Sequence, residues 1–178
     1  MLTPKNLKRM AEFGTIEEMI GGTKLMNLLN EQAPQFSLLN EAGETVSLQD
    51  FKGKNVVLYF YPKDMTPGCT TEACDFRDAH TDFSDLNAVI LGVSMDDEKK
   101  HMKFIEKHGL PFSLLVDADH AVAESYGVWV LKKMYGKEYM GIERSTFLIN
   151  EEGIIVKEWR KVRVKNHIDE VLSFLKGE

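Results

Sequence analysis

The sequence predicts a single α/β domain with a mixed central sheet flanked by helices. After residue 35, short apolar runs of strand length alternate with longer segments whose apolar residues recur at helical spacing. The chain has 178 residues, of which 43% are apolar. That length is enough to bury one substantial core but short for two domains, so one domain is expected.

Six apolar runs are expected to form strands. Residues 56–61, 89–93 and 146–149 are apolar almost throughout, which is typical of central strands covered by helices on both faces. The segment 150–153, NEEG, joins the last two runs and predicts a hairpin, so one edge of the sheet should be antiparallel. The predicted strands are 36–39, 55–61, 88–94, 112–117, 145–150 and 153–159.

Helices are expected in the segments between these strands. The last one is the clearest example, because Ile168, Leu172 and Leu175 fall on one face at helical spacing. The predicted helices are 68–83, 97–108, 119–126 and 165–176.

Residues 1–28 are predicted to form a short helical N-terminal appendage, ahead of a domain at 29–178. The sequence TIEE at 15–18 matches a capping box that opens a helix, and the glycine pair at 21–22 ends it. Its apolar residues are expected to dock on the same domain.

Charge and hydropathy limit the kinds of partner that the protein is expected to bind. The chain carries 28 acidic and 22 basic residues, a formal net charge of −6, and this balance disfavours nucleic acid as a partner. No apolar run approaches the roughly 20 residues of a membrane helix, and the N-terminus lacks a secretory signal pattern. These features predict a soluble, cytoplasmic protein that does not associate with membranes.

Both cysteines of the chain lie in one short segment, and Cys69 has the setting of a nucleophile. Pro62 follows a predicted strand, and Pro67-Gly68 prepares the first turn of a helix. Unpaired backbone N–H groups and the positive end of the helix dipole there favour thiolate over thiol, and the thiolate is the reactive form. Thr66 could bond the thiolate or a substrate oxygen, or act as a plain cap residue.

Cys74 is too distant along a helix to bond to Cys69 directly. Two helical residues five positions apart have Cα atoms roughly 8–9 Å apart and point about 140° away from each other. A disulfide requires less than about 7 Å. The two thiols are therefore either unbonded, or bonded only after the first turns of the helix unwind, as a thiol that consumes peroxide would require.

The segment 60–78, FYPKDMTPGCTTEACDFRD, together with YGVWVLKKMYGKEYMGIERSTFLIN at 126–150, resembles the peroxiredoxins of the bacterioferritin-comigratory-protein (PrxQ) type. The likeness covers about residues 31–176, and it is most specific at Pro62-x-x-x-Thr66-x-x-Cys69 and at Arg144 before STFLI. It implies a thioredoxin-like fold and a thiol peroxidase that reduces hydrogen peroxide and organic hydroperoxides.

The same resemblance implies roles for the two cysteines. Cys69 would be the peroxidatic cysteine and Cys74 the resolving one, joined in an intramolecular disulfide that thioredoxin or a similar thiol reductant recycles. A monomer is expected because the disulfide closes within one chain. Neither a cofactor nor a metal ion is expected.

The resemblance also implies roles for the residues around the thiol. Thr66 and Arg144 would position the peroxide and stabilise the thiolate, Pro62 would shield the site, and Glu72 would be a partner of Arg144. Without the motif, an ordinary ion pair would explain Arg144 as well.

Two other functions are consistent with parts of the sequence. A thioredoxin-like dithiol-disulfide oxidoreductase would exchange disulfides with proteins, but that class usually has Cys-x-x-Cys, whereas four residues separate the cysteines here. Cys69, Cys74 and His80 could instead be metal ligands, although three candidates without a second cysteine pair make a poor zinc site. All five histidines stand among polar residues and are expected on the surface: His80, His101, His108, His120 and His167.

Overall fold

The computed structural model describes residues 27–178. The helix predicted at 15–18 and the docking of its apolar residues lie outside this range. The domain boundary after residue 28 stays a prediction. Over the described residues, no helix is both long enough and apolar enough to span a membrane.

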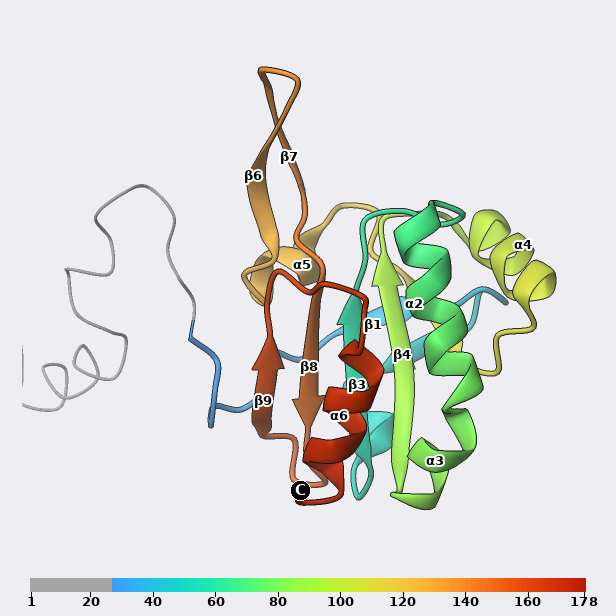
Figure 1. Cartoon of the computed structure of the whole chain (residues 1–178), viewed down its shortest axis with the longest axis vertical. Coiled ribbons are helices and arrows are strands. Elements are labelled where there is room, and N and C mark those ends of the chain that lie inside the picture. Colours follow the sequence, from blue (N-terminus) through green and yellow to red (C-terminus); the bar gives the residue numbers. More distant parts are fainter. Residues whose placement is uncertain (1–26) are drawn as a thin grey trace, which may run out of the picture.

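A seven-stranded sheet forms the centre of the molecule, in the order β2-β1-β5-β4-β3-β8-β9 (Figure 1). β3 pairs in parallel with β4, and β4 pairs in parallel with β5. β8 runs antiparallel to both β3 and β9, so the sheet is mixed and the predicted hairpin at 150–153 is present. The strands are β1 (Ser37–Leu39), β2 (Thr45–Ser47), β3 (Asn55–Phe60), β4 (Ala88–Ser94), β5 (Ser113–Val116), β8 (Ser145–Ile149) and β9 (Ile155–Trp159).

Helices cover both faces of the sheet and create two cores. Alternate residues of β3 point to opposite faces, so Leu58 and Phe60 enter one core while Val57 and Tyr59 enter the other. The core that contains Tyr59 lies under α2, α3, α4 and α6, and α5 contributes to the opposite core. The helices are α2 (Pro67–Asp78), α3 (His80–Asp85), α4 (Glu98–His108), α5 (Ala121–Ser125) and α6 (His167–Leu175).

The single helix predicted at 68–83 is wrong, because the structure divides it into α2 and α3 at Ala79. The backbone of Ala79 has φ −97° and ψ 5°, outside the helical range. Phe76 and Phe83 are both fully buried on either side of this break, with ring centroids 5.8 Å apart. The break lets both rings pack into the same core.

Four further elements were not predicted from the sequence. β2 and the 3-10 helix η2 (Leu48–Phe51) are short, and η2 is held by a capping box between Ser47 and Asp50. β6 (Trp129–Met134) and β7 (Lys137–Ile142) form a hairpin that projects from the body of the molecule (Figure 1). Most of the hairpin is exposed, so its residues lack the apolar alternation of a half-buried strand.

The expectation that all histidines lie on the surface is wrong for two of them. His101 on α4 and His167 on α6 are 0% and 2% exposed. Each has a buried polar partner: His101 Nδ1 lies 2.7 Å from Asp64 Oδ2, and His167 Nε2 lies 2.7 Å from the hydroxyl of Thr146. Those partners are distant in sequence, so local polarity could not reveal the burial.

Candidate active site

Cys69 occupies the first turn of α2, close to the carboxyl end of β3. A loop at 61–66 connects the two elements, Thr66 is the N-cap residue and Pro67 is the first helical residue. The backbone N–H groups of this turn have no partner within the helix, so the thiol lies at the positive end of the helix dipole, as predicted. Cys69 is only 2% exposed.

Arg144 bridges Cys69 and Glu72. The residue lies between β7 and β8, next to the central strand β3. Its Nη2 donates to Cys69 Sγ at 3.3 Å, and its Nη1 donates to Glu72 Oε1 at 2.8 Å. The predicted contact between Glu72 and Arg144 is therefore present. The guanidinium can stabilise negative charge on the sulfur while the carboxylate holds it in place.

Gly68 makes room for this guanidinium, in addition to its predicted place in the first turn of the helix. A Cβ added at Gly68 would lie 3.2 Å from Arg144 Nη2, closer than most such contacts. The glycine is visible in the Thr-Pro-Gly-Cys stretch of the sequence. Only the position of Arg144, 76 residues later in the chain, explains why a larger residue would not fit there.

Glu72 is a buried carboxyl group whose pKa is raised. Burial raises its pKa to about 7, although the charge and hydrogen bond of Arg144 act in the opposite direction. Within residues 27–178, its second oxygen and the hydroxyl of Tyr59 are both buried without a hydrogen-bond partner. Burial, followed by the charges of Glu72 and Cys69, raises the pKa of Tyr59 well above its usual value. Tyr59 therefore stays protonated near the site.

Lys132 adds a second cation from the projecting hairpin, and it was missed in the sequence. Partial burial, followed by the charge of Arg144, lowers the pKa of Lys132, while the charges of Glu143 and Cys69 act in the opposite direction. The mostly exposed β6–β7 hairpin offered no signal in the sequence that the charge of one of its lysines is felt at the thiol.

Thr66 and Pro62 lie near Cys69 along the chain but do not bond to it. The Thr66 hydroxyl donates to the carbonyl of Lys63 at 2.8 Å, and its side chain makes no capping bond in α2. Pro62 is exposed, two residues after the end of β3. Their roles toward peroxide stay predictions.

Cys74 lies on the same helix as Cys69, and both thiols are free. Its Sγ lies 3.8 Å from His108 Nδ1 at the end of α4. Arg77 fixes this helix end, since its Nη1 donates to the carbonyl of His108 at 2.7 Å. Residues 69–74 are helical, which is the geometry that the spacing argument assumed.

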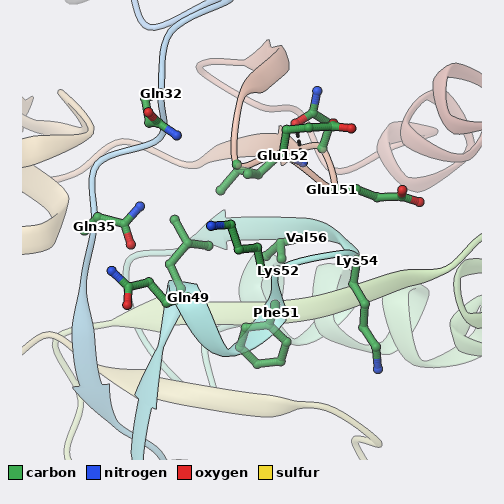
Figure 2. A pocket seen from close by; sticks show the side chains of 13 residues that line it. Gln32, Gln35, Gln49, Phe51, Lys52, Lys54, Val56, Glu151 and Glu152 are labelled. Atoms are coloured by element: carbon green, nitrogen blue, oxygen red, sulfur yellow. Dashed lines mark hydrogen bonds between the residues drawn. The ribbon is translucent and has the colours of Figure 1, made fainter.

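A separate pocket of about 530 Å³ lies at the end of the sheet away from Cys69. Figure 2 shows the residues that line it. The pocket borders Val56 at the start of β3, whereas Cys69 follows the other end of that strand. Lysines and glutamates share its lining, including Lys52, Lys54 and Glu151. Neither cysteine lines it, so this pocket is distinct from the thiol site.

The alternative set of metal ligands, Cys69, Cys74 and His80, does not form a cluster. Among the residues that the structure describes, no group of three or more Cys, His, Asp or Glu side chains is arranged to hold a metal ion.

Comparisons with known proteins agree with this geometry. The model of the AhpC/TSA family matches residues 29–158. Peroxiredoxin Bcp of Bacillus subtilis is 64% identical over 148 residues, which cover 83% of this chain and 94% of the relative. Peroxiredoxin Bcp of Escherichia coli is 46% identical over 144 residues, or 81% of this chain and 92% of the relative.

Solved structures show the same fold. A structure of peroxiredoxin Q from Xanthomonas campestris superposes with a TM-score of 0.77 at 46% identity, covering 80% of this chain and 90% of the other. A structure of the Xylella fastidiosa PrxQ C47S mutant superposes with a TM-score of 0.78 at 39% identity, covering 88% and 98%. The chain therefore has a thioredoxin-like fold, belongs to the AhpC/TSA family and is a peroxiredoxin of the bacterioferritin-comigratory-protein (PrxQ) type, a thiol peroxidase.

Proposed function

We propose that Cys69 is the peroxidatic cysteine, that Cys74 resolves it as an intramolecular disulfide, and that thioredoxin or a similar dithiol recycles the pair. The observation that carries the proposal is the 3.3 Å contact between Arg144 Nη2 and Cys69 Sγ at the start of α2. Cys74 lies on the same helix, where it can reach Cys69 once the helix opens.

In the first step, the Cys69 thiolate attacks one oxygen of the hydroperoxide. The O–O bond breaks, the sulfur becomes a sulfenic acid, and the other oxygen leaves as water or an alcohol after taking up a proton. The negative charge moves from the sulfur to the leaving oxygen as the O–O bond breaks, and we assign Arg144 the stabilisation of this charge next to the sulfur. We assign Thr66 and Pro62 the positioning and shielding of peroxide, because both lie in the loop that leads from β3 to Cys69.

In the second step, the Cys74 thiolate attacks the sulfenic sulfur of Cys69. The S–O bond breaks, hydroxide takes up a proton and leaves as water, and a disulfide forms. A dithiol reductant then supplies two electrons and two protons to restore both thiols. Because Cys74 belongs to the same chain, no second subunit is needed, which supports a monomer.

The substrates include organic hydroperoxides in this proposal. A relative from Xanthomonas campestris has been crystallised in connection with its alkyl peroxide reduction activity, at 46% identity to this chain. We assign the protein to the cytoplasm, where thioredoxin keeps thiols reduced.

Intact-mass analysis after one equivalent of hydrogen peroxide tests the two roles. The unaltered protein should lose two hydrogens as it forms the internal disulfide. Cys69→Ser should show no oxidation, while Cys74→Ser should stop at the sulfenic acid and consume one equivalent without turnover by thioredoxin. His80→Gln is a suitable control, since His80 lies on α3 outside the proposed site.

Two outcomes would contradict the assignment. A Cys69→Ser protein that still consumes peroxide would place the first step elsewhere. A Cys74→Ser protein that turns over normally with thioredoxin would give the resolving role to an external thiol.

A further inference from the structure

A buried ion pair connects the loop ahead of Cys69 to α4. His101 Nδ1 lies 2.7 Å from Asp64 Oδ2, and the two side chains are 0% and 3% exposed. The other carboxylate oxygen of Asp64 accepts a 2.6 Å hydrogen bond from the hydroxyl of Tyr61. The second ring nitrogen of His101, Nε2, lies 3.0 Å from the carbonyl of Leu115. Both ends of the imidazole are therefore occupied.

These partners require a charged histidine. A carbonyl oxygen can only accept, so Nε2 must carry a proton, and the Asp64 carboxylate requires a second proton on Nδ1. Burial opposes this charge, but the hydrogen bond and charge of Asp64, the Leu115 carbonyl and the charge of Asp96 together outweigh it, so the pKa of His101 is raised. Asp96 accepts a hydrogen bond from the backbone of Asp64, and Lys100 lies 3.9 Å from Asp96. The negative charges of Asp64 and Asp96 are therefore balanced by two positive charges only while His101 is protonated.

The ion pair holds a strained part of the chain. Met65, directly after Asp64, has φ 65°, in the left-handed region that costs a residue other than glycine about 1–2 kcal/mol. Such a conformation persists only where its surroundings fix it. The backbone N–H of Asp64 donates to Asp96 at 2.8 Å, and the carboxylate of Asp64 is fixed by His101. Thr66, the N-cap of α2, follows at once.

We propose that the Asp64–His101 ion pair is a positioning element of the peroxidase, which holds the 61–66 loop in the conformation that presents Cys69 to the hydroperoxide. The inference rests on the proposed role of Cys69. Neither Asp64 nor His101 contacts the thiol, so both act through the loop that begins the helix. A small displacement of that loop would move Cys69 relative to Arg144, and displacements of about 1 Å can cost up to about a hundredfold in rate.

The proposal includes a dependence on pH with a definite sign. The positioning element is present at pH values below the raised pKa of His101 and is lost as pH rises through that value. The rate constant for oxidation of Cys69 should first rise with pH as the thiolate forms. At higher, alkaline pH it should fall, because the positioning element is lost. Four titratable or charged groups surround His101. Asp64 and Tyr61 come from the loop, Asp96 from the segment after β4, and Lys100 lies on α4, where it pairs with Asp96.

The test compares His101→Gln with the unaltered protein and with the control His80→Gln. The second-order rate constant of each with hydrogen peroxide is measured by competition with a haem peroxidase, from neutral to alkaline pH. His101→Gln should react roughly tenfold to a hundredfold more slowly and should lack the alkaline fall, because glutamine carries no charge to lose. His80→Gln should keep both the rate constant and the fall.

A second variant covers the case in which His101→Gln does not fold, as judged by circular dichroism. Asp64→Asn keeps the size of the side chain and removes only its charge, and it should show the same slower reaction and the same loss of the alkaline fall. Full rate constants and an unchanged pH profile in a folded variant would overturn the inference and leave the ion pair a purely stabilising one. Cys69→Ser in the same assay separates the two proposals, because undiminished reaction of Cys69→Ser would refute the role of Cys69 itself.

Discussion

Formation of the Cys69–Cys74 disulfide should unwind the first turns of α2. In the reduced protein both residues are helical, with Cα atoms roughly 8–9 Å apart, whereas a disulfide requires less than about 7 Å. Closing the bond must release the backbone hydrogen bonds donated by the amides of residues 70–74, beginning with that from Thr70 to Thr66 at 2.9 Å. At about 1 kcal/mol for each of these amides, the local loss is about 5 kcal/mol.

The unwound segment should end before Phe76. Its side chain is fully buried, and its ring stacks on Tyr59 with centroids 4.7 Å apart. Releasing Phe76 would expose a large apolar surface, and this cost of about 1.5–3 kcal/mol would add to that of the further hydrogen bonds. The opening is therefore expected to be local, with the central strands unaffected.

Amide hydrogen exchange read by mass spectrometry measures this directly. In the oxidised protein, exchange at residues 70–74 should accelerate by about a thousandfold or more, as the loss of about 5 kcal/mol implies. Peptides from β3 and β4 should keep their protection. Cys74→Ser treated with the same peroxide is the matched control, because it can reach the sulfenic acid but cannot close the disulfide.

Unchanged protection at residues 70–74, in a protein whose Cys69–Cys74 bond has been confirmed by peptide mapping, would contradict the expected unwinding. That result would mean that these residues are not helical in the reduced protein. Acceleration that extended into β3 would contradict the expected boundary at Phe76.

Three further predictions concern the charges around the site. Arg144→Ala should slow oxidation of Cys69 by roughly a hundredfold, because one donor to the developing charge is lost; a rate constant equal to that of the unaltered protein would make Arg144 structural only. The raised pKa of Glu72, about 7 against 4.5, means that the folded state holds a proton that the unfolded state has released, so stability falls as pH rises through about 7. Glu72→Gln should remove this decline of up to about 3 kcal/mol in urea unfolding between about pH 4.5 and 7, and a decline that persists would assign it to other groups. Burial and then the charge of Arg144 lower the pKa of His167 to about 4, so stability should fall as pH drops from 6.5 towards 4. Thermal unfolding of His167→Gln should lack that fall, and an equal acid sensitivity would show that His167 is not its source.

The strands and most helices could be predicted because their signal is local. Apolar runs such as 56–61 mark strands buried on both faces, and the predicted hairpin at 150–153 needed only its turn residues. The break at Ala79 was not predictable in this way, since it depends on how Phe76 and Phe83 share one core. The β6–β7 hairpin was missed for the opposite reason, because it is mostly exposed and has no core pattern.

For the site, the sequence alone determined which residue is the nucleophile and that Cys74 cannot bond to it while the helix is intact. Cys69 directly after Pro67-Gly68 predicts a thiol at a helix N-terminus, and the spacing to Cys74 excludes a disulfide within an intact helix, because both follow from the dimensions of one helix. Only the tertiary structure decided which distant groups surround that thiol. Arg144 reaches Cys69 across 75 residues of sequence, and His101 fixes Asp64 across 37. Such contacts depend on the order of strands in the sheet and on helix packing, and no local pattern encodes the distance between two side chains that the fold brings together.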